Sequence, residues 1–212
     1  MRFADARRRL ERLPSPLPRG RIELTPTLIL RGEPPEAFRR AIGGPVRDAA
    51  ALVLVYPGDD DEAHLVLTVR PSGDHAHAGQ VALPGGKREP EEDFPDGTAL
   101  REAAEEVGLD APRAGVSIMG RLDVVDVRVS GFLMVPVVAI AERAPELVPH
   151  DREVAAILRV PVGRFLSDAP IEIIEEERGG LHLRYGAYPV EGHRVWGATG
   201  QVLAQLGAIL SS

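Results

Sequence analysis

The sequence has no cysteine and few aromatic residues. Without cysteine there can be no disulfide framework, thiolate metal site or cysteine nucleophile, and this composition fits a reducing cytoplasm. Aromatic residues make up only 4% of the chain, so we expect a core built mainly of valine, leucine, isoleucine and alanine. The length of 212 residues fits one domain that carries a terminal extension.

Long apolar runs are also missing. The longest, residues 131–141, is interrupted by Pro136 and falls far short of the roughly 20 residues needed to cross a bilayer. The first residues, MRFADARRRLERLPSP, are charged and lack the apolar centre of a secretory signal. We therefore expect a cytoplasmic protein with no membrane partner.

Positive charge is scarce. The chain has 25 lysine and arginine residues against 32 aspartate and glutamate residues, a formal net charge of −7. Binding to a nucleic-acid backbone draws its affinity from cationic side chains that release counterions, so we expect no nucleic-acid partner. An anionic small molecule would need cations placed locally at its site.

The sequence pattern changes near residue 45. Residues 1–45 form an arm whose predicted first helix, over residues 2–13, is stopped by prolines; the arm is expected to pack on the domain, swap into a partner subunit or stay mobile. Residues 46–212 form the domain, with helices predicted over 98–107 and 198–210. A mixed sheet covered by helices is predicted. Its strand-like runs are residues 50–56, 64–69, 80–83, 116–122, 133–140, 155–160, 171–174 and 181–185.

The segment that carries chemistry is residues 83–109, LPGGKREPEEDFPDGTALREAAEEVGL. Its Pro-Gly-Gly at residues 84–86 predicts a tight loop whose backbone carbonyls can approach a ligand closely. On the helix that follows, Glu102, Glu105 and Glu106 share one face. Three carboxylates crowd this face, close to the helix C-terminus, where the helix dipole also disfavours anions.

A bound cation would turn this unfavourable arrangement into a favourable one. A divalent ion held by the carboxylates and a backbone carbonyl of the glycine loop would reverse both penalties, and hard oxygen ligands favour Mg²⁺ or Mn²⁺. The alternative is an ordinary solvent-exposed face that is rich in glutamate.

The same segment resembles the Nudix box, G-x5-E-x7-R-E-U-x-E-E-x-G-U, in which U is an aliphatic residue. Eight residues rather than seven separate Glu92 from Arg101, so either the loop carries an insertion or Asp93 takes the place of the first acid. The resemblance implies the Nudix fold, an α/β (α+β mixed) structure that forms an α/β/α sandwich around a mixed sheet. The residues at the pattern's positions are Gly86, Glu92, Arg101, Glu102, Ala103, Glu105, Glu106, Gly108 and Leu109.

Residues 66–86, VLTVRPSGDHAHAGQVALPGG, are similar to the segment L-L-T-x-R-S-x3-R-x3-G-x3-F-P-G-G of the coenzyme A diphosphatase branch of Nudix hydrolases. His75 stands where that motif has a basic arginine or lysine, and Pro71 replaces its small serine. Trp196, Gly197 and Thr199 resemble the branch's W-G-x-T signature.

The implied activity is hydrolysis of coenzyme A or an acyl derivative to 4′-phosphopantetheine, or its acyl form, and adenosine 3′,5′-bisphosphate. Two alternatives stay open. One is a Nudix diphosphatase for ADP-ribose, dinucleotides or nucleoside triphosphates, and the other is a non-catalytic nucleotide-sensing Nudix domain. A homodimer also stays open.

The resemblance implies roles for the residues of the box. Glu102 and Glu106 are the first candidates as ligands of Mg²⁺ or Mn²⁺, followed by the Gly86 carbonyl and Glu105. Arg101 would hold a carboxylate in position; its alternative is a surface ion pair with Glu105, one helical turn away.

Residues outside the box complete the expected site. The general base is Glu105 or Glu153, and the alternative for Glu153 is an ordinary charged loop residue. Trp196 is expected in the core rather than in a binding surface. The candidates for substrate binding are Arg70, His75, His77 and Gln80.

Overall fold

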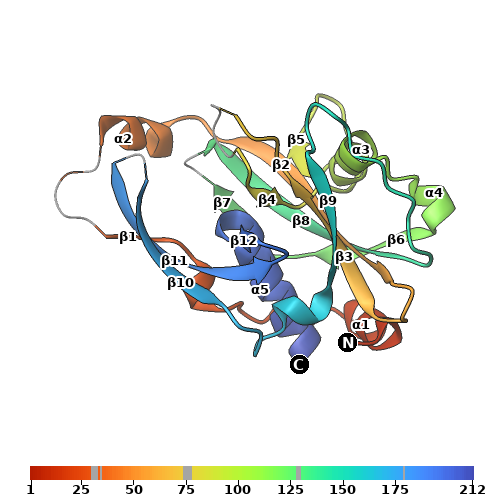
Figure 1. Ribbon diagram of the computed structural model, residues 1–212. Helices are drawn as coiled ribbons and strands as arrows, with labels where there is room; N and C mark the ends of the chain where they lie inside the picture. Colours follow the sequence, from red (N-terminus) through yellow and green to blue (C-terminus); the bar gives the residue numbers. More distant parts are fainter. Residues whose placement is uncertain (30–32, 34, 74–77, 128–129, 179) are drawn as a thin grey trace.

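The computed structural model describes the whole chain except residues 30–32, 34, 74–77, 128–129 and 179 (Figure 1). Its helices are α1 (Phe3–Leu10), η1 (Ile22–Leu24), α2 (Glu36–Gly43), α3 (Asp96–Val107), α4 (Ala111–Ala114), η3 (Val162–Phe165) and α5 (Gly197–Ser211). Its strands are β1 (Thr27–Ile29), β2 (Arg47–Pro57), β3 (Ala63–Val69), β4 (Val81–Ala82), β5 (Gly85–Lys87), β6 (Val116–Arg121), β7 (Val125–Val127), β8 (Phe132–Ala141), β9 (Ala156–Pro161), β10 (Glu172–Arg178), β11 (Leu181–Val190) and β12 (His193–Val195).

The main sheet is built around β2. This strand pairs in parallel with β8 and antiparallel with β3 and β5, and the order along the sheet is β4-β3-β2-β8-β6, with β9 on β3 and β7 on β8. Every residue of β2 from Ala49 to Tyr56 is buried, because both faces of the sheet are covered. A strand covered on both faces has an unbroken run of apolar residues instead of an alternating pattern. The sequence of β2 contains such a run.

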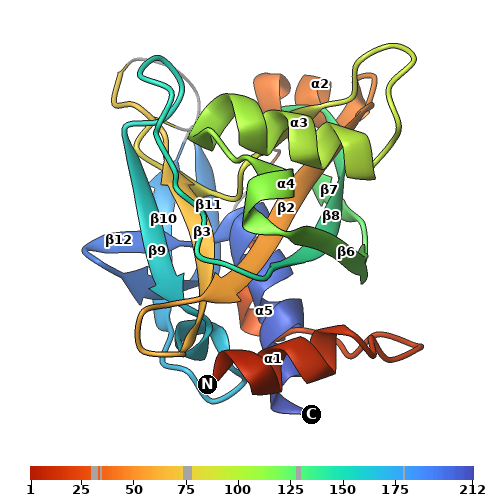
Figure 2. The ribbon, with the colours of Figure 1, turned by 90° about the vertical axis from the view of Figure 1, so that its right-hand side faces the viewer.

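Helices cover the two faces of this sheet, as Figure 2 shows. On one face, Ala99 and Ala103 of α3 pack against Leu52 and Leu54 of β2 in one buried cluster. On the opposite face, α5 joins a second cluster, of which Leu203 is a fully buried member. The predicted α/β/α sandwich around a mixed sheet is confirmed.

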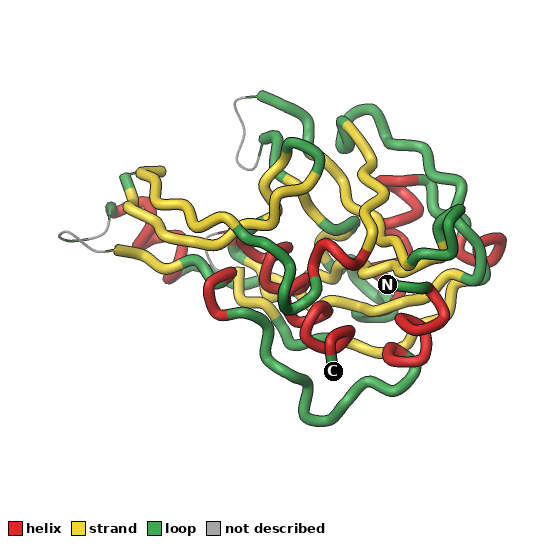
Figure 3. Tube along the Cα trace, turned by 60° about the horizontal axis from the view of Figure 1, so that its bottom comes forward, coloured by secondary structure: helices red, strands yellow, loops and turns green. Residues whose placement is uncertain are grey.

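The strands beyond residue 170 form a second sheet, which the sequence interpretation had merged with the first. Here β11 pairs antiparallel with β10, β1 and β12. In Figure 3 part of this sheet extends away from the rest of the chain. The prediction of one sheet was wrong because β1 joins β11 across more than 150 residues of sequence, and no local pattern records such a pairing.

The first helix of the N-terminal arm packs on the domain. Phe3, Ala6 and Leu10 are buried in the same cluster as the core side of α5, and Arg9 donates a hydrogen bond to the carbonyl of Leu210. This helix ends at Leu10 rather than at the predicted residue 13. The division of the chain at residue 45 stays a prediction. Among the described residues, no helix is long and apolar enough to cross a membrane.

Candidate active site

Helix α3 carries the acidic side chains, and its position is set by one buried face and by its C-terminal end. Ala99, Ala103 and Val107 bury one face of the helix against the main sheet. Gly108 ends the helix in the left-handed conformation, with φ of 66°, which glycine adopts without steric cost. These anchors place Glu102 next to β5, and the site is formed where α3 meets this strand.

Strand β5 contains the two glycines that the sequence interpretation placed in a tight loop. That prediction was wrong for Gly85 and Gly86, because both pair with β2, opposite Ala51 and Ala50. A β-carbon on Gly85 would lie only 2.5 Å from the carbonyl oxygen of Ala50, and one on Gly86 would lie 2.7 Å from Oε2 of Glu102. Glycine is therefore needed at Gly85 for strand pairing and at Gly86 to admit the Glu102 carboxylate.

Glu106 is a half-buried acid of the site. The backbone N–H of Gly85 donates to its Oε2 at 3.1 Å. The pKa of Glu106 is raised to about 7, chiefly by burial and also by the charges of Glu102 and Glu153, while the Gly85 hydrogen bond and Arg70 oppose the rise. The carboxylate of Glu106 thus lies where negative charge is costly and a compensating cation would be stabilising.

Glu102 has the same tendency in a weaker form. Burial raises its pKa, Arg101 opposes this, and the charges of Glu105 and Glu153 add to the rise. The charge of Glu102 also raises the pKa of Glu106. The acidic face predicted from the helix spacing is therefore a partly buried cluster of like charges rather than a fully solvated face.

Arg101 organises the cluster. Its guanidinium donates to Glu92 Oε1 and Glu105 Oε2, both at 2.8 Å, to Glu102 Oε1 at 3.0 Å, and to the carbonyl of Lys87 at 3.1 Å. The planar fork of arginine suits several fixed acceptors at once. Arg101 therefore holds three carboxylates, where the sequence led us to expect one.

Glu92, not Asp93, is the acid that meets Arg101. Glu92 also accepts hydrogen bonds from the Thr98 hydroxyl at 2.7 Å and from the Glu89 N–H at 3.1 Å. The Arg101 hydrogen bond, together with those of Thr98 and Glu89, lowers the pKa of Glu92 to about 2 against the opposing effect of burial. The side chain of Asp93 is exposed. The extra residue is therefore accommodated between Glu92 and α3 without displacing Glu92.

Two candidates from outside the box come near the cluster. Glu153 lies in the segment after β8, which is tied to the end of α3 by the His150 N–H on the Glu106 carbonyl at 2.9 Å. Arg70 follows β3 and is exposed, and its N–H donates to the carbonyl of Gln80 at 3.0 Å. The charges of both Glu153 and Arg70 act on Glu106, so both belong to the surroundings of the acidic cluster.

The oxygen donors of the cluster fit a divalent cation in chemistry. Across the described residues, no three acidic or histidine side chains are already gathered as a metal site, because Arg101 bonds Glu102 and Glu105 while Gly85 bonds Glu106. The raised pKa values of Glu102 and Glu106 nevertheless mark carboxylates whose ionised forms are only partly compensated by these contacts. Hard oxygen ligands of this kind suit Mg²⁺ or Mn²⁺.

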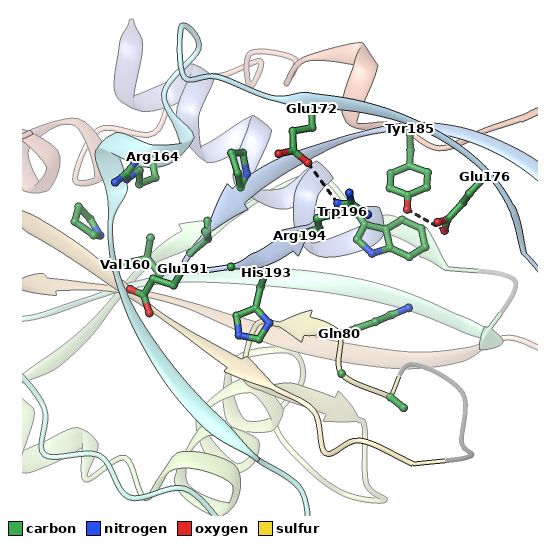
Figure 4. A pocket seen from close by; sticks show the side chains of 16 residues that line it. Gln80, Val160, Arg164, Glu172, Glu176, Tyr185, Glu191, His193, Arg194 and Trp196 are labelled. Atoms are coloured by element: carbon green, nitrogen blue, oxygen red, sulfur yellow. Dashed lines mark hydrogen bonds and ion pairs between the residues drawn. The ribbon is translucent and has the colours of Figure 1, made fainter.

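A cavity of about 750 Å³ lies between the end of β9, β11 and β12. Gln80, whose role in substrate binding stays a prediction, is one of its lining residues, and so is Trp196, which was wrongly expected in the core (Figure 4). Trp196 is half-buried and stacks on Tyr185, with ring centroids 4.3 Å apart. No local sequence signal marks Tyr185 or Glu176 as cavity residues, because the cavity depends on the pairing of distant strands. His75 and His77 lie outside the described residues.

The comparisons with known proteins agree with this architecture. Residues 46–175 match the NUDIX domain family, which covers more than half of the chain. The chain belongs to the Nudix hydrolase family, whose members act on diphosphate-containing, nucleotide-derived small molecules and generally use divalent metals such as Mg²⁺ or Mn²⁺.

The relatives carry the same family name. The chain is 35% identical to the uncharacterized Nudix hydrolase NudL of Photorhabdus laumondii over 67% of this chain and 74% of that protein. It is 34% identical to the NudL of Yersinia enterocolitica over 74% and 78% of the respective chains. Among solved structures, RenU, a Nudix hydrolase from M. smegmatis, is similar with a TM-score of 0.48 and 27% identity, over 57% of this chain and 74% of RenU.

Proposed function

We propose that this protein is a coenzyme A diphosphatase that hydrolyses coenzyme A or acyl-coenzyme A in the cytoplasm. The observation that supports a diphosphatase is the pair of carboxylates Glu102 and Glu106, of which Glu106 is bonded to Gly85 and Glu102 lies against Gly86 and is bonded to Arg101. The choice of coenzyme A is supported by the resemblance of residues 66–86 and of the Trp196 segment to that branch of the family.

The metal ligands in this proposal are Glu102, Glu106, the Gly86 carbonyl and Glu105. A bound Mg²⁺ or Mn²⁺ would neutralise charge on the diphosphate oxygens. Arg101 acts on the carboxylates rather than on the substrate, because its donors are already directed at Glu92, Glu102 and Glu105. It is a positioning residue.

Arg70 is the proposed phosphate contact. It is exposed at the end of β3, beside Glu106, and an arginine fork can bind two phosphate oxygens at once. Gln80 lies next to it through the backbone hydrogen bond between the two residues. His75 and His77 stay predicted substrate contacts on the sequence evidence alone.

We assign the proton acceptor to Glu153 in preference to Glu105. Glu105 is already hydrogen-bonded to Arg101 at 2.8 Å, so one of its carboxylate oxygens faces the guanidinium rather than a water molecule. Glu153 is exposed beside the cluster and can take a proton from water. The water oxygen then bonds to phosphorus, and the bond from that phosphorus to the bridging oxygen breaks. The products are 4′-phosphopantetheine, or its acyl form, and adenosine 3′,5′-bisphosphate.

A panel of substrates tests this proposal. The protein is incubated with Mg²⁺ and, separately, with coenzyme A, acetyl-coenzyme A, ADP-ribose, NADH, a dinucleoside polyphosphate and nucleoside triphosphates, and the products are identified by mass. We expect cleavage of the coenzymes with the highest kcat/KM. Rapid cleavage of another compound with none of coenzyme A would instead assign the protein to the alternative diphosphatases. Binding without cleavage of any compound would assign it to the nucleotide sensors.

A further inference from the structure

The cavity beside Gln80 has an aromatic wall made of two stacked rings. Tyr185 is 3% exposed, whereas Trp196 is half-buried and lines the cavity. The ring centroids are 4.3 Å apart and the ring planes are inclined by 24°. Tyr185 therefore supports the indole from the protein side and fixes its orientation. A flat indole held in this way is suited to stacking against a planar ring.

A carboxylate is fixed beside this aromatic wall. The hydroxyl of Tyr185 donates to Oε1 of Glu176 at 3.0 Å, and Glu176 also lines the cavity (Figure 4). An ionised carboxylate has about four acceptor positions and no donor, so Glu176 presents acceptor oxygens to a ligand in the cavity. The favoured ligand is planar and carries N–H donors at its edge.

Carboxylates outnumber guanidinium groups in the lining of the cavity. Glu172, Glu176 and Glu191 line it together with Arg164 and Arg194, and Arg194 is paired with Glu172 at 3.3 Å. Carboxylates repel phosphate oxygens at short range. A nucleotide bound here would place its base inside and its phosphates outside.

The cavity and the acidic cluster meet through Gln80. This residue lines the cavity, and its carbonyl accepts the Arg70 N–H at 3.0 Å. The charge of Arg70 in turn acts on Glu106. One substrate can therefore extend from the aromatic wall, past Gln80, to the proposed phosphate contact and the acidic cluster.

We infer that the cavity lined by Trp196, Tyr185 and Glu176 binds the adenine base of the substrate. The base stacks on Trp196, and its exocyclic amino group donates a hydrogen bond to Glu176. This inference rests on the proposed function, which identifies the substrate that carries the adenine base. It makes Trp196 and Glu176 specificity-determining residues for an adenine nucleotide, and it leaves the pantetheine arm outside the cavity.

The only tryptophan of the chain lies in the cavity, so its fluorescence reports directly on occupancy. The protein is titrated with AMP, with ribose 5-phosphate and with 4′-phosphopantetheine, with excitation beyond the absorption of adenine. We expect saturable quenching by AMP and none by the other two compounds. Quenching by 4′-phosphopantetheine and not by AMP would overturn the inference, as would the absence of quenching by all three.

Two neighbouring glutamates on β10 provide a test of the carboxylate's role and its control. Glu176 lines the cavity, whereas its neighbour Glu177 is exposed and is not among the lining residues, as the alternation of side chains along a strand requires. Glu176→Gln should weaken AMP binding about tenfold, the effect of losing one hydrogen bond to a charged acceptor, and Glu177→Gln should leave it unchanged. Equal effects of the two substitutions would contradict the assignment.

The aromatic wall is tested by kinetics. Loss of a base-stacking ring typically weakens binding by about tenfold or more, so Trp196→Leu should raise KM for the adenine-containing substrate by about tenfold with little change in kcat. Trp196→Phe, which keeps an aromatic face, should restore most of the binding and serves as the control for folding. An unchanged KM in folded Trp196→Leu would overturn the inference.

The quenching titration also separates this inference from the proposed function. If no coenzyme is cleaved but AMP quenches and Glu176→Gln weakens that quenching, the proposed function fails and the adenine site stands. If coenzyme A is cleaved but AMP does not quench, the adenine site fails and the proposed function stands.

Discussion

The carboxylate of Glu102 lies directly against Gly86. A β-carbon on Gly86 would meet the carboxyl group of Glu102, which supplies its three nearest heavy atoms, so the contact joins the end of a side chain to a strand. Apart from the metal-ligand role proposed for its carbonyl, Gly86 thus leaves the space that the Glu102 carboxylate occupies.

Gly86→Ala should therefore lower activity more than stability. The added methyl group displaces the flexible Glu102 side chain and not the backbone, so we expect a folded protein whose kcat/KM falls by about tenfold to a hundredfold, the range for misplacing a group that stabilises the transition state. Gly43→Ala, where the structure has open space around the added carbon, is the control. Activity and the midpoint of thermal unfolding are measured for both variants, and normal turnover in Gly86→Ala would contradict the role of this contact.

Glu106→Gln should remove most activity while leaving the fold intact. Glutamine keeps an oxygen that can accept the Gly85 N–H but loses the charge, and we expect kcat to fall by about a hundredfold or more. Because burial raises the pKa of Glu106 to about 7, its ionised form opposes folding above that pH. Thermal unfolding at pH 8 should show a variant at least as stable as the natural protein.

The control for this substitution is Glu146→Gln, an exposed glutamate paired with Arg113 away from the cluster. It should change neither activity nor stability measurably. If Glu106→Gln turned over substrate at a near-normal rate, its assignment as a metal ligand would be wrong.

The ion pair of Glu92 and Arg101 predicts a loss of stability in acid. The pKa of Glu92 is lowered from 4.5 to about 2 in the folded protein, so the stabilisation is complete above about pH 4.5 and is lost as the pH falls through about 2. Glu92→Gln should lower the free energy of unfolding at pH 7 by about 1–3 kcal/mol. Urea unfolding should show this difference shrink toward pH 2. The exposed neighbour Glu89 provides the control Glu89→Gln, and a difference that stays constant with pH would argue against the pair.

The general base is identified by comparing two substitutions. Glu153→Gln should lower kcat about a hundredfold, the lower end of what a general base contributes. Glu105→Gln should lower kcat less than Glu153→Gln does, because Glu105 is bonded to Arg101 and is a proposed metal ligand rather than the proton acceptor. The reverse order of effects would assign the base to Glu105.

Local sequence pattern predicted the acidic helix well. The helical spacing of Glu102 and Glu106 requires only the period of an α-helix, and Gly108 ends the helix as its sequence indicates. Glu92 could not be placed in the same way, because the extra residue between Glu92 and Arg101 left open whether Glu92 or Asp93 is the first acid of the box. The hydrogen bond to Arg101 at 2.8 Å depends on how the loop returns to the helix, which spacing alone does not define.

The cavity shows where local pattern stops being informative. Trp196 was expected in the core because its flanking residues are apolar, yet its ring forms a wall with Tyr185 and Gln80, which are separated from one another by more than 100 residues of sequence. The pairing of β10, β11 and β12 creates that wall. Gly85 and Gly86 illustrate the same limit, because glycines that suggest a loop locally are needed here for close pairing with β2.

Titration with Mn²⁺ tests the central claim most directly, namely that Glu102 and Glu106 hold a divalent cation. Uptake is measured by calorimetry for the natural protein and for the double variant Glu102→Gln/Glu106→Gln, each checked for folding by circular dichroism and each titrated with and without adenosine 3′,5′-bisphosphate. The account predicts saturable uptake by the natural protein and at least about a hundredfold weaker uptake by the double variant. Equal uptake by both proteins, or none by the folded natural protein with the nucleotide present, would contradict it.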